Sequence, residues 1–592
     1  MTDISGAFDR VDTFMAQHHA GGASPGLSYG VVHGDLLVHT GGLGLSRLHE
    51  TGSTPGPDTV FRIASMSKSF TAAAVLMLRD AGLVRLDAPI ADYVPELRNL
   101  VLPTTDSVLP TVRDVLTMSA GFATDDPWAD REESMSPSEY SSLLTAGFTF
   151  DEAPGTAYDY SNLGYTMLGR VISNASSLPF QEFVSSRILA PLGMTSSGYS
   201  VADISLPHLA EGYFRFDEDW QVEPTASTGE FAALGGLFST VRDLSRWVSV
   251  LAGAFPARDG HDPAIPMSRA SLREMQQGVR FVRANSGIVV GPQPISGEMS
   301  SYGFGLVVTI DQRFGPIVSH AGGYPGYGSH MIWHPASGVG VISLANGRYA
   351  DSARQAGPRS LNALLAEIDA PARSVRLTSA TLAAHATIDD LLDQWDDTVA
   401  DSIFAANVDS DYPRDRRRGD VASAVSEVGG LTGPAFDVSA MTPSNISWWR
   451  PARSGRLRVE IYLTPQASQL VQTLIARAVP DPTPELVAIA HSVVSSLWSL
   501  VPAWPSGVPR AESVDVPALV SAAATARAAL VTGLVSPLPT EATSATSATF
   551  ALTGSAVRSA LMITWDSASG EVTACSLTTT ADDWAASRRI VG

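Results

Sequence analysis

Short runs of hydrophobic residues, bounded by polar or glycine-containing turns, recur along the first 370 residues and predict β-strands. The runs 26–32 and 36–40 flank a His-Gly-Asp turn, which predicts a β-hairpin. Because later strands joined by short turns pair antiparallel, the same character downstream predicts one antiparallel sheet. These later runs are 305–310, 315–320, 331–334 and 338–344.

A helical spacing of hydrophobic residues marks the stretches around and between those runs. The helices predicted in this way lie at about 4–18, 71–79, 111–118, 241–250 and 360–368. The acidic and aromatic stretch 122–150 is interpreted as a loop-and-helix excursion over a cleft. The pattern therefore predicts an α+β fold, an α/β sandwich in which an antiparallel sheet from both ends of this part is flanked by helices and carries an all-helical insertion.

Composition changes near residues 369–374, which are interpreted as a linker. The sequence thus predicts a domain of residues 1–370 and an accessory region of residues 371–592. The accessory region is predicted to be α+β, either undivided or split into two subdomains at about 371–480 and 481–592. Its predicted elements are a helix opened by a capping box at Thr387–Asp390, a strand at 456–463, a helix at 484–493, a hairpin over 560–577 and a Ser/Thr/Ala-rich loop at 540–549.

The bulk composition argues against several classes of partner. The net charge of −21 and a pI of about 4.9 disfavour nucleic acid and anionic membranes. A single cysteine, Cys575, allows no intramolecular disulfide, and the 12 histidines show no metal-binding spacing, so neither a metal nor another cofactor is expected. Without a secretory signal or a membrane-length apolar run, the sequence predicts a cytoplasmic protein that acts on a small molecule. Self-association into a homo-oligomer is left open.

Lys68 is the only lysine among the 592 residues. It follows Ser65 by three residues at the start of a predicted helix, so both side chains project from one face. Arginine stays protonated and cannot take a proton from a serine hydroxyl, whereas a desolvated lysine can. Ser65 and Lys68 are therefore a candidate nucleophile and proton acceptor, and the Ser65 N–H is available to an oxyanion. The alternative is a solvated lysine without a chemical role.

Two further stretches supply candidate partners. Tyr160-Ser161-Asn162 follows a Pro-Gly turn and precedes a helix, where a phenol and an amide can point into a cleft. The alternative is a structural tyrosine beside an N-cap asparagine. His320-Ala321-Gly322-Gly323 ends the strand predicted at 315–320, which is taken to be an edge strand lined with glycine N–H groups. A nucleophile, a phenol that relays protons and free N–H groups are the parts that acyl transfer needs.

In this order the three motifs resemble those of the serine hydrolases that include class C β-lactamases, penicillin-binding DD-peptidases and family VIII esterases. The resemblance extends over roughly residues 5–370 and implies a β-lactamase-like domain there. It includes the supporting segments Leu86–Ile90, Pro154–Thr156, Pro191–Thr195 and Gly235–Thr240.

The resemblance implies a role for each motif residue. Ser65 matches the acylated nucleophile, Lys68 the amine that activates it, and Tyr160 the phenol that carries a proton to the leaving group. Since Lys68 and Tyr160 should titrate as a pair, neither is assigned as the base. The implied substrate-binding residues are Asn162, His320, Ala321 and Gly322, and the implied oxyanion hole is formed by the N–H groups of Ser65 and Gly323.

The third motif departs from the penicillin-recognising pattern, which has lysine in place of His320 and threonine or serine in place of Ala321. Histidine is mostly neutral at pH 7 and alanine has no hydroxyl, so the anchor for a substrate carboxylate is weakened. The sequence therefore predicts a metal-free serine hydrolase of small esters or amides, with an esterase as the first choice. A D-amino-acid amidase or peptidase is the alternative and a weak β-lactamase the third choice. A non-catalytic binding protein with a vestigial pocket is the alternative of a different class.

Overall fold

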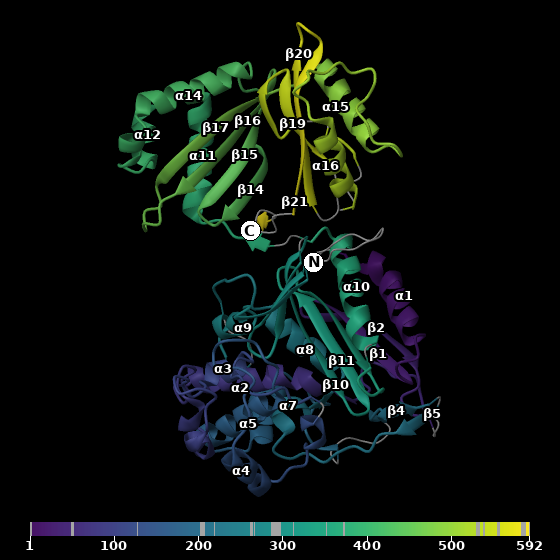
Figure 1. Cartoon of the computed structure of the whole chain (residues 1–592). Helices are drawn as coiled ribbons and strands as arrows, with labels where there is room; N and C mark the ends of the chain where they lie inside the picture. Colours follow the sequence, from purple (N-terminus) through teal and green to yellow (C-terminus); the bar gives the residue numbers. More distant parts are fainter. Residues whose placement is uncertain are drawn as a thin grey trace. The chain divides into compact units, whose positions relative to one another are not determined.

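The computed structural model of the chain is shown in Figure 1. It describes residues 3–48, 52–126, 128–201, 208–217, 219–260, 265, 267–285, 298–311, 313–350, 352–370, 373–528, 533–536, 539–552, 557–581 and 588–590. The chain divides into two units. Unit 1 contains residues 1–285, 299–310 and 316–370, and unit 2 contains residues 286–298, 311–315 and 371–592.

Strands from both ends of unit 1 meet in one sheet, in the order β2-β1-β12-β11-β10-β9-β8-β7. The pairs β2–β1, β1–β12, β12–β11, β11–β10 and β9–β8 run antiparallel, with Tyr29 opposite Ser343 and Gly323 opposite Gly328. The strands are β1 (Gly26–His33), β2 (Leu36–Gly44), β7 (Arg280–Asn285), β8 (Glu298–Tyr302), β9 (Val307–Asp311), β10 (Gly315–Tyr324), β11 (Tyr327–His334) and β12 (Val339–Ala345). The predicted antiparallel sheet with flanking helices is confirmed.

The sequence analysis wrongly placed β10 at the edge of the sheet, and it missed the strands β7 and β8. β10 lies inside the sheet, whereas β2 and β7 form its edges. However, the five residues of β9 can accompany only half of the ten residues of β10.

Helices cover both faces of this sheet. On one face, α8 (Val241–Ala252) places Val241 against Gly30 and Val248 against Gly340. On the other face, α10 (Ser352–Glu367) lies beside α1 (Phe8–His19) (Figure 1) and packs on β11 and β12. All residues of β1, β11 and β12 are buried in consequence. This explains why these strands read as nearly continuous apolar runs.

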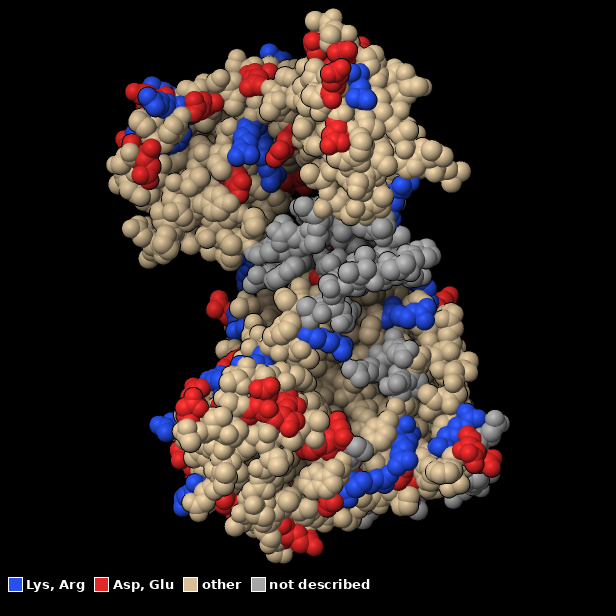
Figure 2. Space-filling model, viewed as in Figure 1, with Lys and Arg blue, Asp and Glu red and all other residues tan. Residues whose placement is uncertain are grey.

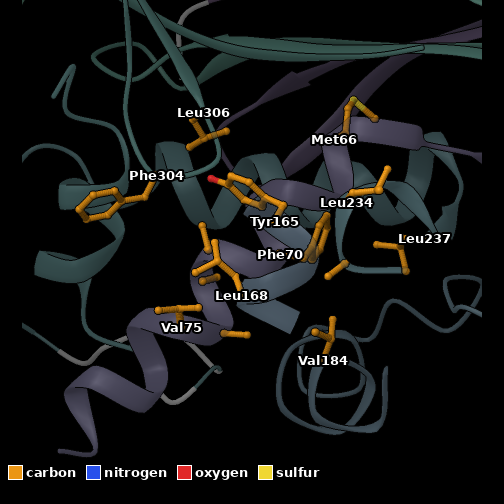
Figure 3. Packing of buried hydrophobic residues seen from close by; sticks show 14 of the residues in the cluster. Met66, Phe70, Val75, Tyr165, Leu168, Val184, Leu234, Leu237, Phe304 and Leu306 are labelled. Atoms are coloured by element: carbon orange, nitrogen blue, oxygen red, sulfur yellow. The ribbon is translucent and has the colours of Figure 1, made fainter. Parts of the chain in front are cut away.

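The centre of the helical part of unit 1 is α2 (Ser67–Asp80), the helix that carries Lys68. Every residue from Ser67 to Leu78 is buried, so the helix is surrounded by protein on all sides. Figure 3 shows Phe70 and Val75 of α2 in one hydrophobic cluster with Tyr165 and Leu168 of α5 (Asn162–Ser176). Dense packing of this kind holds α2 and α5 in fixed positions.

Short elements complete unit 1. The remaining α-helices are α3 (Val112–Leu116), α4 (Pro137–Ala146), α6 (Phe180–Val184), α7 (Ala232–Gly235) and α9 (Arg269–Met275). Two small antiparallel pairs are β3 (Phe61–Arg62) with β6 (Phe238–Ser239), and β4 (Tyr213–Phe216) with β5 (Asp219–Val222).

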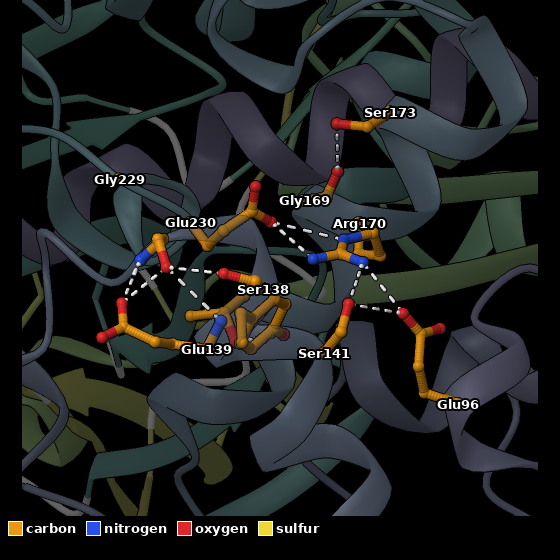
Figure 4. A network of polar contacts seen from close by, with 12 residues as sticks. Glu96, Ser138, Glu139, Ser141, Gly169, Arg170, Ser173, Gly229 and Glu230 are labelled. Atoms are coloured by element: carbon orange, nitrogen blue, oxygen red, sulfur yellow. Dashed lines mark hydrogen bonds and ion pairs between the residues drawn. The ribbon is translucent and has the colours of Figure 1, made fainter.

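A partly buried polar network fixes α5 to its neighbours (Figure 4). The Arg170 guanidinium on α5 forms ion pairs with Glu96 at 2.9 Å and with Glu230 at 3.0 Å. It also donates a hydrogen bond to the hydroxyl of Ser141 on α4, at 3.1 Å. Because three segments converge on one guanidinium, the network braces the helix whose first residue is Asn162.

Unit 2 repeats one order of elements twice, helices followed by a four-stranded antiparallel meander, and each repeat has its own hydrophobic cluster. The first comprises α11 (Ser379–Asp393), α12 (Asp397–Ile403), α13 (Val408–Asp411), α14 (Arg414–Glu427), β14 (Phe436–Thr442), β15 (Asn445–Ala452), β16 (Gly455–Leu463) and β17 (Val471–Pro480). The second comprises α15 (Pro484–Leu497), α16 (Val516–Ala528), β18 (Glu541–Ser544), β19 (Ser547–Leu552), β20 (Val557–Asp566) and β21 (Glu571–Ala581). A parallel pair, β13 (Arg373–Val375) with β22 (Arg588–Ile590), accompanies them. Among the helices that are described, none is long and apolar enough to cross a membrane.

Two sequence predictions in unit 2 are wrong. Helix α11 begins after Thr378, whose hydroxyl accepts the N–H of Thr381, and not at the capping box predicted at Thr387. Thr387 lies inside the helix, where its hydroxyl donates to the Ala383 carbonyl. The stretch 540–549, predicted to be a loop, instead forms β18 and the start of β19.

Candidate active site

Ser65 lies in the 3-10 turn Ala64–Met66, which links β3 to α2. Ala64, directly before it, has a φ of 50°, in the left-handed region that residues other than glycine rarely adopt. β10 approaches this turn closely, because a Cβ atom on Gly322 would lie 2.4 Å from the Ile63 carbonyl oxygen. Strained backbone of this kind is concentrated at functional sites. Glycine at position 322 is what allows the third motif to reach the turn that carries Ser65.

The structure brings two predicted residues to the Ser65 hydroxyl. Lys68 Nζ lies 3.0 Å from Ser65 Oγ, one helical turn along the chain. The Tyr160 hydroxyl lies 3.0 Å from the same oxygen and donates to it. Tyr160 comes from the loop before α5, so packing of α5 on α2 is what places it. The three side chains form a connected set of a hydroxyl, an amine and a phenol.

The surroundings of Lys68 suit a neutral amine. Its side chain is fully buried, and Nζ donates to Asn162 Oδ1 at 2.7 Å and to the Leu234 carbonyl at 2.9 Å. A neutral amine has two N–H groups and one lone pair. In a neutral Lys68 these two acceptors take both N–H groups and the lone pair is left for Ser65 Oγ, whereas an ammonium would donate to all three oxygens.

Burial also makes the neutral amine accessible near physiological pH. Burial disfavours the ammonium form and lowers the pKa of Lys68 to about 8, although the negative charge of Asp126, followed by that of Asp130, opposes the shift. For Tyr160, burial raises the pKa well above its ordinary value, with the charge of Asp126 acting in the same direction. Tyr160 therefore stays a neutral phenol, a proton donor, over the range in which Lys68 titrates.

Asn162 is held by two acidic residues that the sequence analysis did not single out as site residues. Its side-chain amide nitrogen donates to Asp126, which turns Oδ1 toward Lys68. The Asp125 carboxylate accepts the backbone N–H of Asn162 at 2.8 Å and that of Leu163 at 2.6 Å, at the N-terminus of α5. Asp125 thus fixes the start of the helix and Asp126 fixes the orientation of the amide.

His320 lies on β10 and is buried. Its Nε2 is 3.1 Å from the hydroxyl of Tyr302 on β8, and its Nδ1 is 2.6 Å from the Ala321 carbonyl oxygen. A carbonyl can only accept, so Nδ1 carries a proton. Nε2 accepts from Tyr302 in a neutral ring and donates to it in a protonated ring. The centre of the Tyr158 ring lies 5.8 Å from that of the Tyr302 ring, so Tyr158, Tyr302 and His320 form a row of aromatic side chains.

Gly323 follows on the same strand, beside an aromatic side chain that motif analysis missed. A Cβ atom on Gly323 would lie 2.8 Å from Cδ1 of Tyr349, whose hydroxyl donates to Asp130 at 2.9 Å. Burial raises the pKa of Asp130 to about 6. The assignment of the Ser65 and Gly323 N–H groups to an oxyanion hole stays a prediction.

A buried ion pair joins the acidic stretch 122–150 to β3, the strand before Ser65. Glu133 forms an ion pair with Arg62 of β3 at 3.0 Å, and both side chains are buried. The Arg62 guanidinium also lies over the ring of Tyr324, 4.1 Å from its centre. Through this pair the stretch that bears Asp125, Asp126 and Asp130 is joined to the strand that leads into Ser65.

Sequence motifs alone could not have identified every group at the site. The Leu234 acceptor is a backbone carbonyl, and no side chain marks it. Asp126 and Tyr302 come from segments with no fixed spacing to Ser65. The only signal for Asp126 was the acidic composition of the stretch 122–150.

Comparison with known proteins agrees with these motifs. The family model described as Beta-lactamase matches residues 11–365. D-alanyl-D-alanine-carboxypeptidase/endopeptidase AmpH of Escherichia coli K12 is 25% identical over 353 residues, which are 58% of this chain and 84% of that protein. Protein flp of Staphylococcus aureus strain COL is 23% identical over 345 residues, 57% of this chain and 62% of that protein.

Two solved structures illustrate the similarity further. The octameric penicillin-binding protein homologue from Pyrococcus abyssi is 19% identical with a TM-score of 0.49, covering 77% of this chain and 96% of its own. A class C β-lactamase in complex with cefoxitin is 19% identical with a TM-score of 0.49, covering 61% of this chain and 99% of its own. The family match alone spans more than half of the chain, so the protein belongs to the β-lactamase family of serine hydrolases.

Proposed function

We propose that the chain is an esterase that hydrolyses small esters through an acyl-Ser65 intermediate. The observation that carries the proposal is the arrangement around Ser65 Oγ, with Lys68 Nζ and the Tyr160 hydroxyl each at 3.0 Å. Lys68 takes the Ser65 proton as Oγ attacks the acyl carbon. The carbonyl oxygen then gains negative charge, for which the N–H groups of Ser65 and Gly323 are the proposed donors.

The proton balance of this route assigns a role to each group. Tyr160 gives its proton to the departing alkoxide and recovers one from the Lys68 ammonium, so the leaving group departs as an alcohol. Water then attacks the acyl-enzyme, the same groups accept its proton, and Ser65 regains its hydrogen as the acid is released. Asn162 keeps Lys68 in place throughout.

The choice of substrate rests on the third motif. A histidine, which is mostly neutral at pH 7, next to an alanine offers no fixed charge and no hydroxyl to a substrate carboxylate. Esters without a free carboxylate are therefore the preferred substrates. A screen of p-nitrophenyl esters, D- and L-amino-acid amides and nitrocefin tests this, and preference for nitrocefin over every ester would contradict it.

A D-amino-acid amidase or peptidase is the second candidate, supported by the similarity to AmpH, which is named a D-alanyl-D-alanine carboxypeptidase/endopeptidase. Release of free D-alanine from D-alanine amide at a rate above that of any ester in the same screen would favour it. A weak β-lactamase is the third. Homo-oligomerisation and a cytoplasmic location are further proposals, which sedimentation of the purified chain and fractionation of cells test.

The pH dependence of hydrolysis should follow Lys68. Only the neutral amine has a lone pair, so kcat/KM for an uncharged ester should be low in acid, rise as pH increases through about 8 and level off above it. A pH–rate profile, corrected with the Ser65→Ala variant for spontaneous hydrolysis, measures this. Because Lys68 and Tyr160 interact, the observed value belongs to the pair. A profile that falls with rising pH over this range would refute the role given to Lys68.

Changing His320 to lysine should shift substrate preference toward acids. The new ammonium can pair with a substrate carboxylate, so the kcat/KM ratio of carboxylate-bearing to neutral esters should rise about tenfold, the equivalent of roughly 1.4 kcal/mol. His320→Gln, which adds no charge, and His208→Lys, which adds one at an exposed position, are the controls and should leave the ratio unchanged. An unchanged ratio in His320→Lys, with hydrolysis of neutral esters retained, would show that residue 320 does not determine the preference for or against a substrate carboxylate.

A further inference from the structure

One face of the first sheet of unit 2 carries a row of aromatic and cationic side chains. Phe436 of β14 is opposite Trp449 of β15, Trp449 is opposite Arg458 of β16, and Arg458 is opposite Arg477 of β17. Residues directly opposite one another on antiparallel strands project to the same side. These four residues and Arg456, two positions before Arg458, are called the cationic strip below.

The strip is on the side of the sheet away from its hydrophobic cluster. The alternate residues of β16, Leu457, Val459 and Ile461, are buried in that cluster with residues of α11. Since side chains alternate along a strand, Arg456 and Arg458 project from the opposite face. Figure 2 shows basic side chains with acidic ones beside them on this view of unit 2. Arg477 and, at 38% exposure, Phe436 are open to solvent at the two ends of the strip.

Trp449 fixes the two central guanidinium groups. The Arg456 guanidinium lies 4.2 Å from the centre of the indole ring and that of Arg458 lies 5.2 Å from it. The indole is only 8% exposed as a result. Arg456 also donates to the Pro539 carbonyl, and Arg458 donates to the Ser447 hydroxyl at 2.6 Å. The cations are thus held in place without the help of a carboxylate.

Within the described part of the chain, Arg456, Arg458 and Arg477 form no ion pair. Other arginines of the same repeat do, such as Arg450 with Asp393 at 2.9 Å and Arg417 with Asp409 at 2.9 Å. Partly buried arginines usually have an anionic partner. Burial lowers the pKa of Arg456 and of Arg458, although more distant carboxylates oppose it. Those carboxylates are Asp437, Glu460 and Asp481.

We propose that the cationic strip binds a small carboxylate ligand with an apolar body, seated with its carboxylate on Arg458 and Arg477 and its body toward Phe436. Guanidinium groups present paired donors that match a carboxylate. The exposed aromatic ring at the other end of the strip fits an apolar group. Polyanions are unsuited, because three carboxylates flank the strip and the chain carries a net charge of −21. This inference concerns unit 2 and does not depend on the proposed function of unit 1.

Calorimetric titration of the full chain with 3-phenylpropionate tests the proposal, with the neutral 3-phenylpropanamide as the comparison ligand. We expect binding of the acid and no binding of the amide. Arg458→Gln should weaken the affinity for the acid at least tenfold. Arg453→Gln, which removes an exposed arginine in the β15–β16 turn outside the strip, should bind like the wild type. Both variants should keep the circular dichroism spectrum and the urea unfolding curve of the wild type, which shows that unit 2 is folded in them.

Each other result would overturn the proposal. Affinity for the acid that persists in Arg458→Gln would place the carboxylate elsewhere, for example in the active site. Equal binding of the amide would show that the charge is not recognised. Inorganic phosphate that displaces 3-phenylpropionate with equal or higher affinity would show that the ligand class is wrong. Absence of binding to the wild type would remove the site.

Discussion

Ser65→Ala should lower kcat/KM by on the order of 10⁶-fold, and Lys68→Arg by about 10³-fold. Alanine removes the attacking oxygen. Arginine keeps a positive charge at the same position, but it has no lone pair with which to accept the Ser65 proton, and its planar group cannot make the contacts of Lys68 Nζ with Asn162 and Leu234. Hydrolysis of a p-nitrophenyl ester, together with circular dichroism to confirm folding, measures both effects.

A covalent readout makes the same prediction independent of the substrate. A fluorophosphonate probe should label Ser65 in the wild type and should not label Ser65→Ala, with mass spectrometry identifying the modified peptide. Ser186→Ala, at an exposed serine whose hydroxyl donates to the Glu182 carbonyl, is the matched control and should be labelled and active. Lys68→Arg with near wild-type activity would show that another group takes the proton.

Glu133→Ala should destabilise the fold by about 3–5 kcal/mol, because it leaves the Arg62 guanidinium buried without a counter-charge. Arg62 is only 1% exposed, so solvent cannot take the place of the carboxylate. Burial raises the pKa of Glu133 and the positive charge of Arg62 opposes that shift, as expected of a pair that depends on both members. Urea unfolding of the full chain, followed by tryptophan fluorescence, gives the loss as a lower midpoint for the transition of unit 1.

An exposed ion pair gives the comparison for this effect. Arg242 and Asp58 lie 2.6 Å apart, but their side chains are 46% and 61% exposed. Asp58→Asn should therefore cost less than about 1 kcal/mol. A loss in Glu133→Ala no larger than that in Asp58→Asn would mean that Arg62 finds other compensation, and the brace between β3 and the acidic stretch would be unnecessary.

The motif residues could be predicted because local geometry places them. A spacing of three residues brings the side chains of Ser65 and Lys68 to one face. Lys68 stood out because it is the only lysine, and arginine cannot accept a proton in its place. The position of Tyr160 beside Ser65 depends in addition on the packing of α5 on α2, which the sequence does not show. Asp126 and Leu234 lay beyond sequence reasoning, because their positions depend on tertiary packing of segments with no fixed spacing from Ser65. The strain at Ala64 likewise has no sequence signal, since alanine does not favour a positive φ.

The elements of the fold were predictable where the hydrophobic pattern was strong. The hairpin of β1 and β2 was found because two apolar runs flank a glycine-containing turn. At Thr387 the sequence pattern of a capping box was present, but this residue lies inside a helix that begins after Thr378. In β19 the inward residues include Ala548 and Phe550 among serines and threonines. That alternation was too weak to distinguish a strand from a loop.

Because Lys68 is the only lysine in the sequence and is buried in α2, the unfolding of this helix can be followed at one peptide bond. A protease that cleaves only after lysine has one target in the whole chain, the Lys68–Ser69 bond. This bond is enclosed by protein, because α2 is buried from Ser67 to Leu78. Cleavage can occur only in molecules in which that helix has opened. When opening and closing are fast relative to cutting, the rate of appearance of two fragments measures the free energy of opening of this one helix, without a label or a mutation.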